Sequence, residues 1–349
     1  MATDRSPDEL TGHASPIATL VDLVSNAGLC QLLAAAVEFR IADHMMDGAL
    51  RPEQLSALIA ADTGCTRRSL RALATIGFCK ETGDGAYELK ELGAFLSASQ
   101  TSSLRDWLMW FTRHQWGLWP KLSDSIRSGA SVRTALNGVD GFLYLQKHSE
   151  PARVFNGAMS ELTAIVGRRL LDNVDFSRYP EIVDIGGGNG ELLTLILAAY
   201  PKARGIVYDL PHAEQGAIAK IAAKGLSNRC AFQCGDFFER LPRKSSLYLL
   251  KSVLHDWDDA RAEKILETCR AAMGDGSRVL IVERIMPPRM SNSSEDRALA
   301  WTDLMMMIGP GGRERDSDEF IALIERSGLG CSSLINLGFG HFAIEVVPA

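Results

Sequence analysis

The sequence predicts an α/β protein with a mostly parallel sheet in its C-terminal half and a mainly helical N-terminal domain. From residue 178 onward, short apolar runs alternate with helical segments, which is typical of a parallel sheet. The last two apolar runs flank Gly338-Phe339-Gly340 and predict an antiparallel hairpin, whereas residues 16–100 have helical periodicity. Because 349 residues are many for one core, we expect separate domains.

The N-terminal residues 1–100 have the order of a winged helix, in which three helices precede a hairpin. We expect the helices at 18–46, 51–60 and 66–77, and the hairpin at 78–89. Residues 101–170 are again helical and rich in tryptophan and phenylalanine, and residues 171–349 form the α/β domain. Its expected elements are strands at 181–185, 205–209, 230–234, 246–253 and 278–283, a helix at 260–273 and a hairpin at 332–347.

Composition indicates a soluble enzyme. Hydrophobic residues make up 46% and charged residues 23% of the chain, and the net charge of −6 argues against non-specific binding to nucleic acid or to an acidic membrane surface. We find no stretch apolar enough for a transmembrane helix, and residues 1–16 lack the order of a signal peptide. Seven scattered cysteines indicate reduced thiols, so we expect a cytoplasmic protein.

The most informative segment is 183–190, Val-Asp-Ile-Gly-Gly-Gly-Asn-Gly, in which an apolar strand ends in glycines and a helical pattern follows. This arrangement brings backbone amides and a helix N-terminus against a nucleotide-like ligand. Gly186, Gly188 and Gly190 form G-x-G-x-G, whereas the dinucleotide fingerprint needs a glycine where this chain has Glu191. A carboxylate beside the turn favours a cationic ligand over a pyrophosphate. The glycine spacing and the C-terminal hairpin disfavour a NAD-dependent dehydrogenase.

Acidic residues end the next two strands. Asp209 ends the second strand, where a carboxylate can accept hydrogen bonds from both hydroxyls of a ribose. Asp236 and Phe237 follow the third strand and predict an adenine site, in which the acid accepts from the amine and the ring packs on the base. Each residue alone is also compatible with a structural role, but their common position at strand ends favours binding.

The fourth strand ends in a lysine and a histidine, Lys251 and His255, four residues apart. Open α/β sheets bind their ligands at the carboxyl ends of strands, although a lone histidine is more often structural. Asp258 is the expected N-cap of the helix that follows.

Six motifs occur in order along the chain, namely VDIGGGNG, DLPH, GDFF, LLKSVLHDWDD, VLIVERI and GGRER. With them the chain resembles the S-adenosylmethionine-dependent small-molecule O-methyltransferases of the caffeic-acid and hydroxyindole type, which include bacterial relatives in natural-product pathways. The resemblance covers essentially the whole chain. It implies a class I methyltransferase fold, a homodimer formed through the N-terminal winged-helix-like domain, and an S-adenosylmethionine site lined by Gly186, Gly188, Asp209, Asp236, Phe237 and Lys251.

The resemblance also implies that His255 is the general base for a phenolic hydroxyl, with Glu283 and Glu314 on either side of it. A phenol has a pKa of about 10 and an imidazole one of about 6.5, so we expect the proton to leave in concert with methyl transfer. Glu283 would hold the imidazole N–H, unless it pairs with an arginine, and Glu314 would do the same unless it is a surface charge. Because a sulfonium is already an activated methyl donor, we expect no metal.

For the acceptor, the resemblance implies Phe155, Met159 and Leu162 on one side and Met305 and Gly309 on the other. Without the resemblance, Met305 and the methionines after it are simply core residues. The plant enzymes of the family have an asparagine near the position of Gly309 and a histidine at that of Leu162. Both departures remove hydrogen-bond partners, so we expect a more apolar, fused-ring or other natural-product phenol.

Two other functions remain open. A related tailoring enzyme would use the same fold and cofactor for hydroxylation, decarboxylation or a pericyclic step, but these reactions do not need the pair of His255 and Glu283. A winged-helix DNA-binding regulator is suggested by Arg67, Arg68 and Arg71 on the third helix, but the chain is acidic and the turn of the hairpin carries no positive charge.

Overall fold

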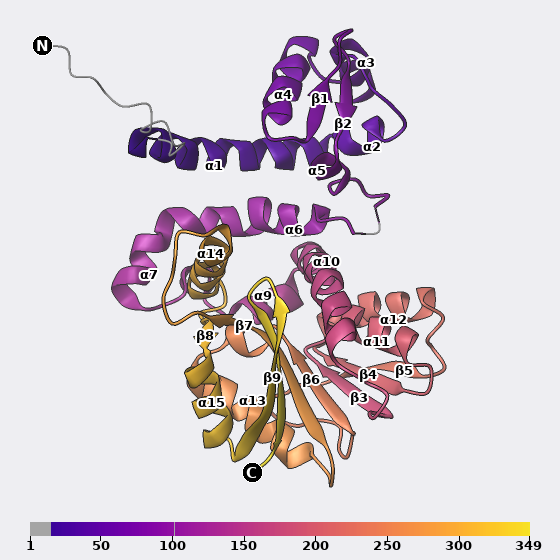
Figure 1. The fold of residues 1–349 in the computed structure, drawn as a ribbon, viewed down its shortest axis with the longest axis vertical. Helices are drawn as coiled ribbons and strands as arrows, with labels where there is room; N and C mark the ends of the chain where they lie inside the picture. Colours follow the sequence, from indigo (N-terminus) through magenta and orange to yellow (C-terminus); the bar gives the residue numbers. More distant parts are fainter. Residues whose placement is uncertain (1–14, 101) are drawn as a thin grey trace, which may run out of the picture. The chain divides into compact units, whose positions relative to one another are not determined.

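The computed structural model describes residues 15–100 and 102–349 and divides into two compact units, Met1–Leu108 and Met109–Ala349 (Figure 1). We expect that residues 1–16 are not a signal peptide. Residues 1–14 of this segment lie outside the described residues. The predicted division at residues 100 and 170 stays a prediction.

The first unit has the predicted order of helices and hairpin. It contains α1 (Pro16–Glu38), α2 (Ile41–Met45), α3 (Pro52–Leu58), α4 (Thr63–Thr75), the antiparallel strands β1 (Cys79–Glu81) and β2 (Tyr87–Leu89), and α5 (Glu91–Ala94). The single helix predicted at 18–46 is wrong, because Arg40 adopts a left-handed φ of 53° and separates α1 from α2.

Helix α1 carries an exposed apolar surface. Its side chains of Ile17, Leu20, Val21, Leu23 and Val24 are all at least 60% exposed. The helix has 23 residues and a mean hydropathy of 1.6 over its most apolar stretch, so by length and composition alone it could cross a membrane. Our expectation that no segment meets this criterion is therefore wrong. One such helix is weak evidence for a membrane, because a helix that packs against protein meets the same criterion.

The second unit begins with short helical segments and then a long helix. After α6 (Arg105–Met109), which spans the boundary, come a π-helical segment (Trp110–Gln115) and a 3₁₀ segment (Trp116–Lys121). Four α-helices follow, namely α7 (Leu122–Ser128), α8 (Val132–Asn137), α9 (Gly141–Lys147) and α10 (Ser149–Asn173).

The sheet of the second unit has the strand order β5-β4-β3-β6-β7-β10-β9, and β8 (Arg315–Asp316) pairs with the end of β7. Its strands are β3 (Glu181–Ile185), β4 (Arg204–Asp209), β5 (Cys230–Cys234), β6 (Leu247–Lys251), β7 (Arg278–Met286), β9 (Leu329–Gly338) and β10 (His341–Pro348). The first five are parallel to one another, and β10 is antiparallel to both β7 and β9. The chain order reverses between β3 and β6, and parallel sheets bind ligands at such a switch point.

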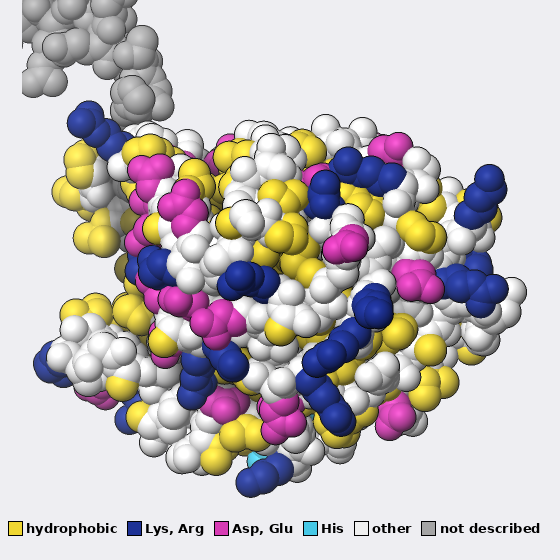
Figure 2. Space-filling view, turned by 90° about the horizontal axis from the view of Figure 1, so that it is seen from below, with side chains coloured by type: hydrophobic (Ala, Val, Ile, Leu, Met, Phe, Trp, Pro, Cys, Tyr) yellow, Lys and Arg dark blue, Asp and Glu magenta, His cyan; other side chains and the backbone are white. Residues whose placement is uncertain are grey.

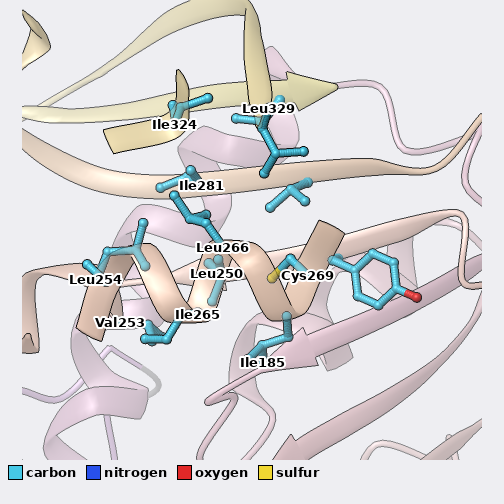
Figure 3. Close-up of a cluster of buried hydrophobic side chains, with 14 of the residues drawn as sticks. Ile185, Leu250, Val253, Leu254, Ile265, Leu266, Cys269, Ile281, Ile324 and Leu329 are labelled. Carbon is cyan, nitrogen blue, oxygen red and sulfur yellow. The ribbon is translucent and has the colours of Figure 1, made fainter. Parts of the chain in front are cut away.

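Side chains alternate between the two faces of this sheet, as the period of a strand requires. Helices α10, α11 (Glu191–Ala199) and α12 (Glu214–Ala223) contribute to one core, and α13 (Asp259–Ala272) and α15 (Ser317–Arg326) to the other. Figure 3 shows part of the second core, in which Leu266 and Cys269 of α13 face Leu250 and Ile281 of the sheet. The expected cap is confirmed, since Asp258 accepts a hydrogen bond from the backbone of Arg261. Because the sheet contributes to a core on each face, we expect the site at the ends of its strands and in the loops that follow them.

The face shown in Figure 2 carries acidic and basic side chains side by side. A surface that binds nucleic acid through its phosphates needs a predominance of positive charge, and this face does not have one.

Candidate active site

The carboxyl ends of β3, β4, β5 and β6 bring the residues predicted to bind the cofactor to one edge of the sheet. The glycine turn follows β3 and ends at Gly190, which caps α11 with a φ of 74°. A Cβ at Gly190 would lie 2.8 Å from Cγ2 of Val207 on β4, so only glycine permits this close approach. The carboxylate of Glu191, from which the sequence favoured a cationic ligand, pairs with Lys220 of α12.

Asp209 is joined directly to the turn. Its Oδ2 accepts a hydrogen bond from the backbone N–H of Gly188 at 2.7 Å, and Oδ1 accepts one from Leu210 at 2.6 Å. Burial raises the pKa of Asp209, and the neighbouring His212 partly offsets this effect. Each carboxylate oxygen retains a further lone pair that can accept a hydrogen bond from a ligand.

Asp236 and Phe237 lie one strand further. Oδ1 of Asp236 accepts from the backbone of Phe238 at 2.8 Å. The ring of Phe237 reaches the glycine turn, since its Cε1 would lie 3.7 Å from a Cβ on Gly186. Phe237 also packs edge-on against Trp257, with ring centroids 6.2 Å apart. The structure thus brings Gly186, Gly188, Asp209 and Phe237 together.

The sequence analysis missed Asp184, which is 3% exposed on β3. Within the described residues its Oδ2 has no hydrogen-bond partner, and it would lie 2.7 Å from a Cβ on Gly187. Burial raises the pKa of Asp184 to about 7, against the opposing effect of Lys251. Burial lowers the pKa of Lys251 to about 8, although Glu283 and Asp184 oppose this. An acid inside an otherwise apolar strand before the glycines was the available signal.

His255 lies in the 3₁₀ turn Leu254–Asp256 after β6, and other elements hold several backbone groups in and beside this turn. Oε1 of Glu283 on β7 accepts from the N–H groups of Val253 and Leu254 at 2.9 and 2.8 Å. The N–H of Arg313 donates to the carbonyl of His255 at 2.9 Å. The backbone of the turn is thereby fixed from the strand and from the following loop.

Arg315, another residue that the sequence analysis missed, completes this hold. It is 1% exposed and donates to the carbonyls of Leu254 and Trp257, both at 2.9 Å. Its charge is compensated by Asp259, 2.8 Å away. Arg315 thus acts on the turn that carries His255 without touching the imidazole.

Three carboxylates surround the His255 imidazole. Nδ1 lies 3.1 Å from Oε1 of Glu314 and 3.7 Å from Oε2 of Glu283, and Nε2 lies 3.8 Å from Oδ1 of Asp256. Both glutamates are buried, and each has one oxygen, Oε2, without a hydrogen-bond partner within the described part of the chain. Only Glu314 is within hydrogen-bond distance of the ring, so Glu283 acts on the backbone of the turn and on the charge of the ring.

The charges in this cluster oppose one another. Burial by itself would lower the pKa of His255, but Glu283, Glu314 and Asp256 outweigh it and raise the pKa to about 10. Burial raises the pKa of Asp256 to about 7 and also raises that of Glu283, and His255 opposes both shifts. In the ligand-free protein the imidazole is therefore in its charged form at neutral pH, with a proton on each nitrogen.

The same three residues also satisfy the geometry of a metal site. His255, Glu283 and Glu314 offer ligand atoms within 4.8 Å of one another. Our expectation that the enzyme uses no metal therefore stays a prediction.

The residues predicted for the acceptor have two sets of neighbours. Phe155, Met159 and Leu162 share one face of α10, and the Phe155 ring lies 5.0 Å from Trp110 and 6.0 Å from Phe142. Phe142 in turn lies 5.4 Å from Trp257, next to the His255 turn.

Met305 and Gly309 lie at the end of α14 (Ser294–Ile308). The carbonyl of Gly309 accepts a hydrogen bond from Ser131 at 2.5 Å, and Asp303 on the same helix accepts from the N–H of Glu314 at 2.9 Å. The end of α14 therefore connects the predicted acceptor residues with the loop that carries Glu314.

Comparison with known proteins identifies the family. The O-methyltransferase dimerisation domain matches residues 21–99, and the O-methyltransferase domain matches residues 119–330. The phenazine O-methyltransferase of Lysobacter antibioticus is 34% identical over 329 residues, which are 94% of this chain and 95% of that protein. The chain therefore belongs to the O-methyltransferase family, as its motifs predicted.

Solved structures agree with the fold. The structure of LaPhzM is 33% identical, has a TM-score of 0.90 and covers 96% of this chain and 100% of its own. An O-methyltransferase from neocarzinostatin biosynthesis, solved with S-adenosylmethionine and 2-hydroxy-5-methyl naphthoic acid, is 26% identical with a TM-score of 0.74 over the full length of both chains. The class I methyltransferase fold and the helical dimerisation domain are confirmed.

We predict that Asp184 makes the ligand-free protein less stable as the pH rises from 4 to 7. The unfolded chain loses this proton near pH 4, whereas the folded protein keeps it until about 7. The free energy of unfolding should therefore fall by about 1.4 kcal/mol per pH unit through this group. Asp184→Asn should remove that slope in urea unfolding, while Asp275→Asn, at an exposed position, should keep it. Parallel slopes for wild type and Asp184→Asn would contradict the prediction.

Proposed function

We propose that the protein transfers a methyl group from S-adenosylmethionine to a phenolic hydroxyl of an aromatic natural product, with His255 as general base. The observation that carries this proposal is the junction of two sites at one sheet edge, since the acid-lined glycine turn lies beside a buried histidine whose Nδ1 is held by Glu314. The solved relatives that contain S-adenosylmethionine support the choice of cofactor.

The residues present fit S-adenosylmethionine. Asp209 would accept from the ribose hydroxyls, and Asp236 with Phe237 would hold the adenine. The unpartnered Oδ2 of Asp184 can accept from the amino group, and Lys251 can pair with the carboxylate. The cofactor supplies an activated methyl group on a sulfonium, so this chain's residues need only position the two reactants and move one proton.

His255 would take the phenolic proton on Nε2. Glu314 accepts from Nδ1–H and so fixes the tautomer that leaves Nε2 as the acceptor. Because the imidazole is protonated in the ligand-free protein, its proton must first leave. The proton on Nε2 is the one that leaves, and Asp256, whose Oδ1 lies 3.8 Å from Nε2 and whose pKa is raised, is the adjacent group that can take it. The base is thus one member of a cluster that shares protons.

We further propose that residues 101–170 and the end of α14 form the acceptor site, with Phe155, Met159, Leu162, Met305 and Gly309 in contact with the ring. We also propose that the protein is a cytoplasmic homodimer that binds neither nucleic acid nor membrane and uses no metal. Membership of a family with a dimerisation domain and the exposed apolar side chains of α1 support the dimer.

Incubation with methyl-labelled S-adenosylmethionine and a panel of phenols, naphthols and polyketides tests whether the protein transfers a methyl group.

Two variants test the roles of individual residues. His255→Ala should bind the cofactor normally but lower turnover at least about 10²-fold, because it lacks the base. Asp209→Ala should instead lose cofactor binding in calorimetry. Unchanged turnover in His255→Ala, or normal cofactor affinity in Asp209→Ala, would refute the role of that residue, and failure to label any acceptor would refute methyl transfer.

Glu314→Gln should shift the pH dependence of kcat/KM. Glu314 is one of the carboxylates that raise the pKa of His255, so its neutralisation lowers that pKa and lets the imidazole lose its proton at lower pH. We expect the rising limb of the profile to move down by about 1 pH unit or more with the same acceptor. Glu267→Gln on the exposed face of α13 is the control and should leave the profile in place. A limb that stays, or moves to higher pH, would rule out this charge coupling.

The double variant Leu20→Glu/Val24→Glu should be monomeric. Both side chains are more than 60% exposed on α1, and burying two carboxylates in an apolar interface is costly. Light scattering during gel filtration measures the mass, with Ile218→Glu at an exposed position of α12 as the control. A wild-type monomer or a dimeric double variant would show that α1 does not form the interface.

A further inference from the structure

A buried arginine lies between the two sets of residues proposed for the acceptor. Arg133 on α8 is 7% exposed. Its Nη2 donates to the carbonyl of His114 at 2.9 Å and to Oε1 of Gln115 at 2.8 Å. The guanidinium carbon lies 5.4 Å from the ring centre of Trp110. His114 and Gln115 belong to the π-helical segment, and such segments are frequent at functional sites.

Arg133 has no counter-ion among the residues that the structure describes. Its partners are a backbone carbonyl and a neutral amide, both reached by Nη2, and the ring of Trp110, none of which carries a negative charge. Burial lowers the pKa of Arg133, yet a guanidinium remains charged at neutral pH. A buried charge without a counter-ion is costly, and a ligand that carries a negative charge would offset this cost.

The neighbours of Arg133 place this charge beside the proposed acceptor site. Trp110 packs edge-on against Phe155, with centroids 5.0 Å apart. On the other side, a Cβ at Gly309 would lie 3.7 Å from Nε2 and 3.8 Å from Oε1 of Gln115. Because the arginine can only donate, it must meet the oxygen of the Gln115 amide, which leaves Nε2 free to donate to a ligand.

We propose that Arg133, supported by Gln115, binds a carboxylate on the methyl acceptor, so that the substrate class is hydroxylated aromatic acids. The inference rests on the proposed function. A guanidinium binds a carboxylate through charge-assisted, often bidentate hydrogen bonds, and the aromatic rings nearby suit the fused-ring body of such an acid. The relative solved with a hydroxy naphthoic acid is consistent with this class.

Matched ligands test the proposal on the wild-type protein. With S-adenosylhomocysteine bound to prevent turnover, calorimetry measures the affinity of isomeric hydroxynaphthoic acids, their methyl esters and the parent naphthols. We expect at least one acid to bind about 10-fold or more tightly than its ester and its naphthol. Equal affinities for every matched set would overturn the proposal without any variant.

Two variants then locate the charge. Arg133→Gln should lose the preference for the acid but keep the affinities for naphthol and S-adenosylhomocysteine. Gln115→Glu gives Arg133 an internal counter-ion and should abolish the preference in the same way, even if Arg133→Gln does not fold. Arg127→Gln, at an exposed position of α7, should keep the preference. Equal weakening of acid and naphthol by Arg133→Gln would assign it a structural role and overturn the proposal.

The labelling experiment distinguishes a failure of this inference from a failure of the proposed function on which it rests. Methyl transfer to naphthols without any preference for acids would contradict the role of Arg133 alone. The absence of transfer to every acceptor, despite normal binding of S-adenosylhomocysteine, would contradict the methyltransferase itself.

Discussion

The turn after β6 depends on hydrogen bonds from buried charged side chains to its backbone, and the rest of the site depends on this turn. Glu283 accepts from two N–H groups on one side, and Arg315 donates to two carbonyls on the other. Charge-assisted hydrogen bonds of this kind are about twice as strong as neutral ones, so the turn is held firmly in one conformation. The position of His255 relative to the glycine turn follows from that hold, because both lie at the ends of adjacent strands.

The electrostatics of the site arise from placing several acids in a volume that excludes water. Asp184, Asp256 and Glu283 all have raised pKa values because burial disfavours their charged forms, whereas Lys251 has a lowered one. A cationic ligand would relieve several of these penalties at once. This is a stronger physical reason for a sulfonium cofactor than the glutamate beside the glycine turn, which is neutralised by Lys220.

Much of the fold could be predicted from the sequence, because strand and helix periodicity are local properties. The strands at 181–185 and 230–234 have the predicted bounds, and the C-terminal hairpin was visible from its glycines. Arg40 was not predicted to break the first helix, since no glycine or proline marks the position. Arg133 and Arg315 could not be recognised as buried either, because each is held partly by backbone carbonyls of other segments, which carry no signature in the chain.

Glu314 and Arg315 are neighbours in sequence, yet one hydrogen-bonds to the imidazole and the other to the backbone beneath it. Glu314 directly precedes β8, whose first residue is Arg315, so inserting or deleting one residue between Gly309 and Glu314 would displace both side chains from their partners. Both contacts therefore constrain the length of this loop. Substitutions on α10 and at the end of α14, where we propose that the acceptor binds, leave both contacts in place, whereas a change in the length of this loop does not.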